Sequence, residues 1–209
     1  MTIRHVAVLA VPATGAEPPE IDPGDFRLAM LEDAYEVAAS LDLVPPALIH
    51  VPGESELEAI TWPGTPIVPA TTLTEAFEAL HGLGGGQAVI LAGDAPDLPG
   101  LLIGKLFRAL SHAPAAVCPS DGGGLVALAA DLPLPAWLAA ELSAELSDGI
   151  LDDPEALTRL RAAAPRPGLV PQAPGWHRLR SPEDLKYLDP RLEGWENTRA
   201  LLSGHPLNR

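Results

Sequence analysis

The chain has 209 residues, a formal net charge of −15 at pH 7 and a hydrophobic fraction of 47%. This length and composition suit one large domain, or one domain with an appendage, built around a sizeable core. With 28 acidic against 13 basic side chains, the sequence lacks the basic stripe typical of nucleic-acid-binding proteins, so we expect no nucleic-acid partner. The single cysteine, Cys118, excludes an internal disulfide.

The amino-terminal segment, MTIRHVAVLAVPATG, predicts a strand over residues 3–11. Its apolar stretch is too short to span a membrane, and no targeting signal accompanies it. We therefore expect a protein without a membrane span, located in the cytoplasm.

Apolar runs and helical patterns alternate along the rest of the chain. A loop over residues 12–24 leads to a helix that we expect to begin at Asp25, as N-cap, and to reach about residue 41. Further strands are expected at residues 47–51, 66–69, 87–92, 115–119 and 125–129, and further helices at residues 72–81, 99–111, 136–145, 154–163 and 192–202. This alternation predicts an α/β fold of three layers, αβα, around a mainly parallel sheet.

A proline-rich loop over residues 165–174 precedes the carboxyl-terminal segment. The segment beyond this loop is too short to fold alone. We expect residues 1–209 to form a single domain, with residues 165–209 packing back on it. Ser181, followed by Pro, Glu and Asp, predicts a helix start within this segment.

The segment QAVILAGDAPDL, residues 87–98, is the most informative part of the sequence. A short apolar run fits a buried strand, and Gly93 ends it, which places Asp94 at the carboxyl end of that strand. Ligands bind at this edge of open α/β sheets, and a carboxylate there can hold a divalent cation that bridges phosphates. The alternative is that Asp94 or Asp97 only caps the helix after it.

Two further features could meet a ligand. The turn at residues 120–124, SDGGG, can present backbone N–H groups to an anion or approach a sugar closely, although a tight hairpin explains it equally well. Basic side chains, Arg178 and Arg180 among them, gather toward the carboxyl end. They form a solvated face or supply the positive charge that an anionic ligand meets.

Four pieces of the chain, in order, resemble the small bacterial nucleotide-diphospho-sugar transferases of the glycosyltransferase-A (GT-A) fold. They are the first strand and loop with the helix FRLAMLEDAYEVA after it, the GDAPDL segment, the strand and turn CPSDGGGLVAL, and the SPEDL helix start. The likeness covers most of the chain. It extends to an uncharacterised glycosyltransferase-A-like branch and to the guanylyltransferases that activate phospholactate or phosphoenolpyruvate.

The resemblance implies roles for particular residues. The loop after the first strand, entered through Ala10 and Val11, would bind the nucleotide. Gly93 and Asp94 would bind the donor, with Asp94 as the ligand of Mg²⁺ or Mn²⁺.

The acceptor side of the site is implied in the same way. Asp97, Gly122 and Gly123 would lie near the acceptor. The resemblance places Asp121 there too, and Asp121 is the one candidate for a catalytic base that we would test.

The sequence departs from the family pattern at two places. The first loop, PATGAEPPEID, lacks the Lys and Arg that grip phosphates in the family, and Arg178 and Arg180 stand where late metal-binding acids are usual. In one outcome, the two arginines replace the metal as a clamp on a diphosphate, because the guanidinium fork bonds phosphate oxygens bidentately. In another, the site is inactive, and in a third the arginines are solvated at a strand edge.

These observations lead to a primary hypothesis and two alternatives. The primary hypothesis is a transferase that uses a nucleotide-activated donor, for glycosyl or nucleotidyl transfer, with a nucleotide or nucleotide-sugar and a small-molecule acceptor as partners. The first alternative is a catalytically impaired member that binds a nucleotide or another protein. The second is a homo-oligomeric protein, for example a homodimer, with the apolar residues 132–142 as its interface.

Overall fold

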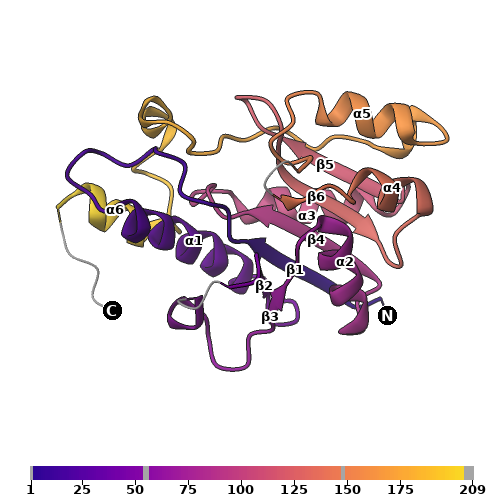
Figure 1. The fold of residues 1–209 in the computed structure, drawn as a ribbon, viewed down its shortest axis with the longest axis horizontal. Coiled ribbons are helices and arrows are strands. Elements are labelled where there is room, and N and C mark those ends of the chain that lie inside the picture. The colour runs from indigo at the N-terminus through magenta and orange to yellow at the C-terminus, as the bar shows by residue number, and fades with distance from the viewer. Residues whose placement is uncertain (1, 54–56, 147–148, 205–209) are drawn as a thin grey trace.

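A computed structural model of the chain describes residues 2–53, 57–146 and 149–204. A six-stranded sheet in the order β3-β2-β1-β4-β6-β5 forms its centre (Figure 1). Its strands are β1 (Arg4–Leu9), β2 (Ala47–His50), β3 (Ile67–Pro69), β4 (Gln87–Ala92), β5 (Ala115–Pro119) and β6 (Leu125–Asp131). β1, β2, β3 and β4 pair in parallel, while β6 lies antiparallel between β4 and β5, so the sheet is mainly parallel, as predicted.

Helices cover both faces of the sheet (Figure 1). The first face carries α2 (Leu73–Gly82), α4 (Ala136–Glu141) and α5 (Ala156–Ala163), and the second carries α1 (Pro23–Ala39) and α3 (Gly100–Ala109). Short 3₁₀ turns, η1 (Leu57–Ile60), η3 (Pro167–Leu169) and η4 (Pro182–Tyr187), and the last helix, α6 (Glu196–Leu202), complete the fold. The predicted three-layer α/β class is therefore confirmed.

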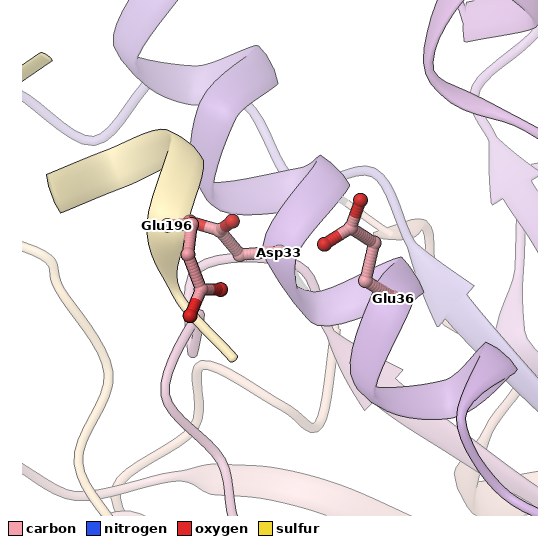
Figure 2. A group of neighbouring side chains, drawn as sticks. All are labelled: Asp33, Glu36 and Glu196. Atoms are coloured by element: carbon pink, nitrogen blue, oxygen red, sulfur yellow. The ribbon is translucent and has the colours of Figure 1, made fainter. Parts of the chain in front are cut away.

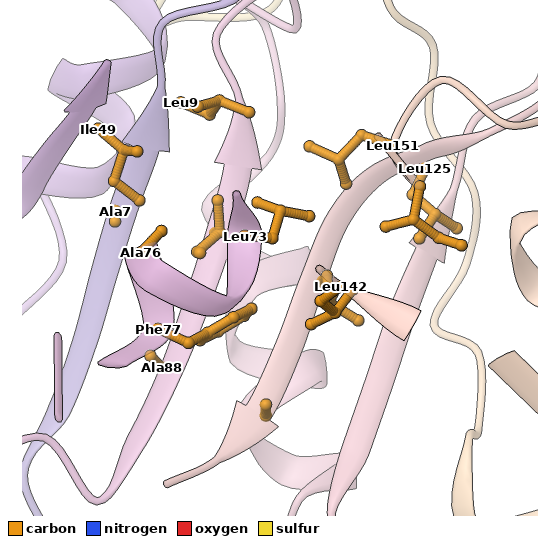
Figure 3. Close-up of a cluster of buried hydrophobic side chains, with 14 of the residues drawn as sticks. Ala7, Leu9, Ile49, Leu73, Ala76, Phe77, Ala88, Leu125, Leu142 and Leu151 are labelled. Carbon is orange, nitrogen blue, oxygen red and sulfur yellow. The ribbon is translucent and has the colours of Figure 1, made fainter. Parts of the chain in front are cut away.

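Strand β4 shows why its sequence is an almost continuous apolar run. Ile90 packs under α2 on the first face, whereas Val89 and Leu91 pack under α1 and α3 on the second face. A strand covered on both sides buries its side chains on both faces, and residues 88–92 are accordingly all apolar and buried. Figure 3 shows the first face, where Leu73 and Phe77 of α2 lie over the sheet.

Several element boundaries differ from the prediction. Helix α1 begins at Pro23, and its N-cap is Asp22, which accepts from the backbone N–H groups of Gly24 and Asp25. The predicted cap Asp25 is therefore wrong: the proline takes the first helical position, where its missing N–H costs nothing. Helix α4 ends at Glu141 rather than at residue 145, and α6 begins at Glu196 rather than at residue 192.

The apolar stretch at residues 132–142 packs against the protein's own core. Leu138 and Leu142 are buried in the cluster on the first face, and Leu132, Leu134 and Trp137 pack partly against it. Core packing accounts for the apolar character that suggested an oligomer interface. Within the described residues, no helix is long and apolar enough to cross a membrane.

The carboxyl-terminal segment returns across the sheet. It runs beside β5 through parallel bridges from Val117 to Gln172 and from Ser120 to Trp176. It then crosses the end of β4, where the N–H of Leu179 donates to the carbonyl of Asp94 at 2.8 Å. The predicted capping box at Ser181 forms, but it opens the 3₁₀ turn η4 instead of a full helix. Beyond it, α6 packs against α1.

Gly93 ends β4 at a point where two backbones nearly touch. A Cβ at this position would lie 2.7 Å from the carbonyl oxygen of Leu9 in β1 and 2.6 Å from the Leu31 side chain. Neither group has room to move within a packed core. The structure thus gives Gly93, which the resemblance assigned to donor binding, a packing role that sets the position of Asp94.

We expect Gly93→Ala to lower the free energy of unfolding by about 1–3 kcal/mol, as overpacking does in a dense core. Gly104→Ala is the matched control, because Gly104 lies within α3 and a Cβ there meets nothing within 4 Å. The control should be neutral or stabilise the protein by about 0.5–1 kcal/mol. Urea denaturation of both variants measures the difference. A Gly93→Ala protein as stable as the wild type would contradict the close approach.

Candidate functional site

The centre of the candidate site is a buried ion pair between Asp94 and Arg178. Nε of Arg178 donates to Oδ1 of Asp94 at 2.6 Å, and Nη2 donates to Oδ2 at 2.8 Å. The Arg178 and Asp94 side chains are 2% and 0% exposed. Asp94 does not cap α3, whose N-cap is Pro99 without a side-chain hydrogen bond. The two oxygens of Asp94 are therefore committed to Arg178.

The remaining nitrogen of the Arg178 guanidinium is also held. Nη1 donates to the carbonyls of Leu125 and Leu151, at 3.2 and 3.0 Å, and to Oδ1 of Asp152 at 2.8 Å. Burial acts to lower the pKa of Arg178, but the charges of Asp94 and Asp152 and their hydrogen bonds outweigh it, and the pKa lies above its ordinary value. Arg178 is thus a fixed cation.

Arg180 is held less tightly than Arg178. Its Nη2 contacts the carbonyl of Leu151 at 3.2 Å and Oδ1 of Asp152 at 3.1 Å, and its side chain is 29% exposed. Its Nε is buried without a hydrogen-bond partner among the described residues. Burial, aided by the positive charge of Arg178, lowers the pKa of Arg180. An added anion would relieve both conditions.

A cleft of about 230 Å³ lies beside these arginines. It is lined by Ser120, Asp121, Gly122, His177, Arg178, Arg180, Ser181, Asp184 and Tyr187. The structure thereby brings together Asp121, Gly122 and both arginines, which the sequence had placed in separate segments. Gly123 lies outside this lining, with a φ of 91° that supports the turn.

Ala10 and Val11 lie elsewhere. They line a separate apolar cavity of about 60 Å³, together with Leu73, Leu151 and Asp152 among others. This cavity has about a quarter of the volume of the cleft beside the arginines.

Comparison with solved structures finds the same fold in several enzymes. A protein from Desulfovibrio desulfuricans G20, assigned as a nucleotide-diphospho-sugar transferase, matches with a TM-score of 0.67 and 18% identity, over 100% of both chains. The 4-diphosphocytidyl-2C-methyl-D-erythritol synthase of Anaerococcus prevotii matches with a TM-score of 0.60 and 16% identity, over 97% of this chain and 96% of the other.

A third match carries bound ligands. The glucosyl-3-phosphoglycerate synthase of Mycobacterium tuberculosis, solved with Mg²⁺ and UDP, has a TM-score of 0.55 and 12% identity over 99% of this chain and 81% of the other. No family model matches the chain, and no curated protein matches its sequence.

The chain has the nucleotide-diphospho-sugar transferase fold. The resemblance predicted from four pieces of sequence is therefore confirmed at the level of the fold. At these identities, the fold alone is shared.

The nucleotide-diphospho-sugar transferase fold leads one to expect a metal at Asp94, and the residues present do not fit one there. Both carboxylate oxygens already accept from Arg178. A divalent cation would lie against a guanidinium of like charge in a buried, low-dielectric setting. Asp94 could bind Mg²⁺ or Mn²⁺ only after Arg178 had moved away.

A second buried carboxylate, Asp97, organises a neighbouring group. Nε1 of Trp176 donates to Oδ1 of Asp97 at 3.1 Å, and Nε2 of His177 lies 3.0 Å from Oδ2 and 2.9 Å from Oδ1. The His177 ring also contacts the rings of Trp176, stacked at 4.9 Å, and Tyr187, at 5.6 Å. Asp97 therefore reaches the cleft through His177 and does not cap α3.

Sequence reasoning missed His177. Nothing in the spacing connects it to Asp97, which lies 80 positions earlier. Its one signal is its place directly before Arg178 in the sequence WHRLR.

The turn at residues 120–124 is a tight hairpin that also borders the cleft. The N–H of Ser120 donates to the carbonyl of Gly124 at 2.9 Å, which joins β5 to β6. The hairpin and the ligand-contact interpretations of this turn are thus compatible.

Cys118 lies in β5, just before the turn. Burial and then the charge of Asp121 raise the pKa of the Cys118 thiol to about 12, which makes the thiol inert as a nucleophile.

An acidic group lies on other elements, between α1 and α6 (Figure 2). Asp33, Glu36 and Glu196 offer oxygens within 4.8 Å of one another, which makes the group a candidate cation site. Asp33, however, already accepts from the backbone and side-chain N–H groups of Asn197 and from the backbone N–H of Thr198. Its contacts join α6 to α1, and this accounts for its burial without a metal.

We expect Arg178→Met to lower the free energy of unfolding by about 3–5 kcal/mol, because it leaves the buried Asp94 carboxylate unpaired. Arg159→Met is the matched control, since Arg159 pairs with Asp153 and Glu141 while its side chain is 49% exposed. An exposed pair contributes little. Chemical denaturation measures the free energy of unfolding of both variants. Equal losses in the two variants would show that the Asp94–Arg178 pair is not desolvated.

We also expect Asp33 to make stability pH-dependent. Burial raises its pKa to about 7, although hydrogen bonds from Thr198 and Asn197 act against this. Between the ordinary value of 3.8 and about 7, the native chain holds a proton that the unfolded chain releases. The contribution of Asp33 to stability therefore falls as pH rises through this window, by roughly 4 kcal/mol.

Denaturation at pH 5 and pH 8 tests this expectation. Asp33→Asn should remove that part of the pH dependence, while the exposed control Glu78→Gln should keep it. Identical pH profiles in the wild type and Asp33→Asn would contradict the raised pKa.

Proposed function

We propose that the protein is a transferase that uses a nucleotide-activated donor, for glycosyl or nucleotidyl transfer, and that meets the donor phosphates with arginine instead of a divalent metal. One observation carries this proposal. The buried Asp94–Arg178 pair stands at the carboxyl end of β4, where this type of sheet binds ligands, with Arg180 beside it in the cleft.

The chemistry of the two arginines supports the proposal. Arg178 is positioned on three of its nitrogens, so it provides a cation that needs no reorganisation when a substrate binds. Arg180 keeps an unpartnered Nε and a lowered pKa, both of which a phosphate oxygen would offset. A guanidinium fork also suits phosphate geometry better than a single point charge does.

Roles for the other residues come from this arrangement. Arg180 would stabilise the negative charge that develops on the leaving phosphate, and Asp94 would hold Arg178 in place. Asp121 and Gly122 would face the acceptor, a small molecule in the cleft beside them. Transfer of this kind depends mainly on positioning and electrostatic stabilisation.

A second candidate function is a catalytically impaired protein that binds a nucleotide or another protein. Two observations favour it. The loop over residues 12–24 contains no Lys or Arg, and Arg178 occupies both oxygens of Asp94. In a related form of the main proposal, Asp94 binds Mg²⁺ or Mn²⁺ once Arg178 is displaced.

Thermal denaturation with nucleoside diphosphates, triphosphates and nucleotide sugars tests these proposals, with EDTA in one series and Mg²⁺ or Mn²⁺ in the other. A ligand that binds only the native state raises the midpoint, and the rise grows with the ratio of the free ligand concentration to its Kd. We expect stabilisation in EDTA. Arg180→Gln should weaken binding at least tenfold, while Arg166→Gln, at an exposed position, should leave it unchanged.

The other outcomes separate the candidates. Stabilisation that requires metal and disappears in Asp94→Asn supports a metal bound at Asp94. Binding in EDTA without release of product from any donor supports the impaired protein. No shift with any nucleotide at millimolar concentration rules out nucleotide-dependent function in this chain.

A further inference from the structure

His177 lines the cleft and uses one of its two ring nitrogens in a hydrogen bond. Its side chain is 11% exposed, and Nε2 is committed to the Asp97 carboxylate, whose side chain is fully buried. The other nitrogen, Nδ1, has no hydrogen-bond partner among the described residues. A structural histidine in a protein interior pairs its polar atoms. A half-paired ring on a cleft wall is instead available to a ligand.

The hydrogen bond to the Asp97 carboxylate determines which ring nitrogen of His177 carries the proton. An ionised carboxylate only accepts hydrogen bonds, so Nε2 of His177 must carry the proton. Nδ1 then holds the lone pair of the neutral imidazole. Trp176 Nε1 donates to the same carboxylate and fixes its orientation. Asp97 is thus a positioning residue for the imidazole.

We infer that His177, oriented by Asp97, is the catalytic base that takes the proton of a hydroxyl acceptor in the cleft. The inference rests on the proposed function, because it assigns a residue and an acceptor class to the same transfer. The arrangement of a carboxylate, an imidazole and a hydroxyl is a recurrent way to activate a weak nucleophile.

This assignment also distinguishes between acceptor classes. A phosphate or carboxylate acceptor is already ionised at neutral pH and needs no base. An alcohol keeps its proton until a base removes it during attack. An imidazole nitrogen without a partner, on a residue that lines the cleft together with Ser120 and Arg180, therefore points to an acceptor with a hydroxyl group, such as a sugar or another polyol.

In the transfer step, one bond forms, one bond breaks and one proton moves. The acceptor oxygen forms a bond to the reacting carbon or phosphorus of the donor, and the bond from that atom to the leaving phosphate oxygen breaks. The electron pair of the broken bond departs with the leaving group beside Arg180, which is the nucleoside diphosphate in glycosyl transfer and pyrophosphate in nucleotidyl transfer. The acceptor proton moves to Nδ1 of His177, and Asp97 stabilises the resulting imidazolium.

Asp121 is the competing base, because its carboxylate lines the same cleft without a side-chain partner among the described residues. Within the described part of the chain, no side chain holds the Asp121 carboxylate in one orientation as Asp97 holds His177. Replacing each residue separately distinguishes the two.

The tautomer provides a test that does not depend on activity. Nitrogen NMR of the ¹⁵N-histidine-labelled full chain, at a pH where the imidazoles are neutral, should show His177 protonated on Nε2 and free on Nδ1. Asp97→Asn should lose this bias, while the matched Trp176→Phe should retain it. A neutral His177 protonated on Nδ1 would overturn the inference regardless of substrate.

Turnover provides the second test. Release of nucleoside diphosphate from UDP-, GDP- and CDP-linked sugars is measured with glycerol as the hydroxyl acceptor. His177→Gln should reduce turnover by about 10²–10⁴-fold, the usual contribution of a base, with donor binding unchanged within twofold. In His177→Ala, added imidazole should restore part of the loss. His112→Gln, at an exposed histidine, is the control.

The remaining outcomes test the base assignment and the proposed function separately. Turnover in His177→Gln within threefold of the wild type, or a loss in Asp121→Asn alone, overturns the base assignment. A wild-type chain that binds donors without releasing diphosphate to glycerol or water also overturns it, yet leaves donor binding intact. A chain that binds no donor overturns the proposed function itself, whatever the tautomer of His177.

Discussion

The Asp94–Arg178 ion pair is the contact on which the arrangement of the site depends. Both side chains are buried, so each would carry a large desolvation penalty alone, and their bidentate geometry offsets it. The pair ties the returning carboxyl-terminal segment to the end of β4. Because Arg178 is fixed there, His177 and Arg180 on either side of it both line the same cleft.

The same contact determines what chemistry the site can support. Where a carboxylate in this fold is expected to hold a metal, a guanidinium provides the positive charge from within the chain. Asp152 bonds both Arg178 and Arg180, so a second acid completes the network. The result is a fixed cation at the base of the cleft and a second, incompletely partnered cation nearer to solvent.

The fold could be predicted from the sequence because its signals are local. Apolar runs such as residues 88–92, separated by helical periodicities and turn residues, specify strands buried on both faces. The N-cap of α1 shows the limits of such signals, since several polar residues near a helix start compete for one capping position. The short η4 shows a second limit, because a capping box marks where a helical turn begins but not how long it continues. The residues that the sequence offered for the site stay a prediction as to function. In the structure Asp121 and Arg180 line one cleft, whereas Ala10 and Val11 line a small apolar cavity and Gly93 serves packing.

By itself, the sequence determined the α/β class, the order of the elements and the place of Asp94 at the end of a buried strand. These features depend on periodicity and on residue types within a few positions of one another. Only the tertiary structure decided that Arg178 takes both oxygens of Asp94 and that His177 meets Asp97. These partners lie 84 and 80 positions apart, and no local pattern specifies such pairings. They form because the returning segment is held in register beside β5, which brings the two acids and their partners to one edge of the sheet.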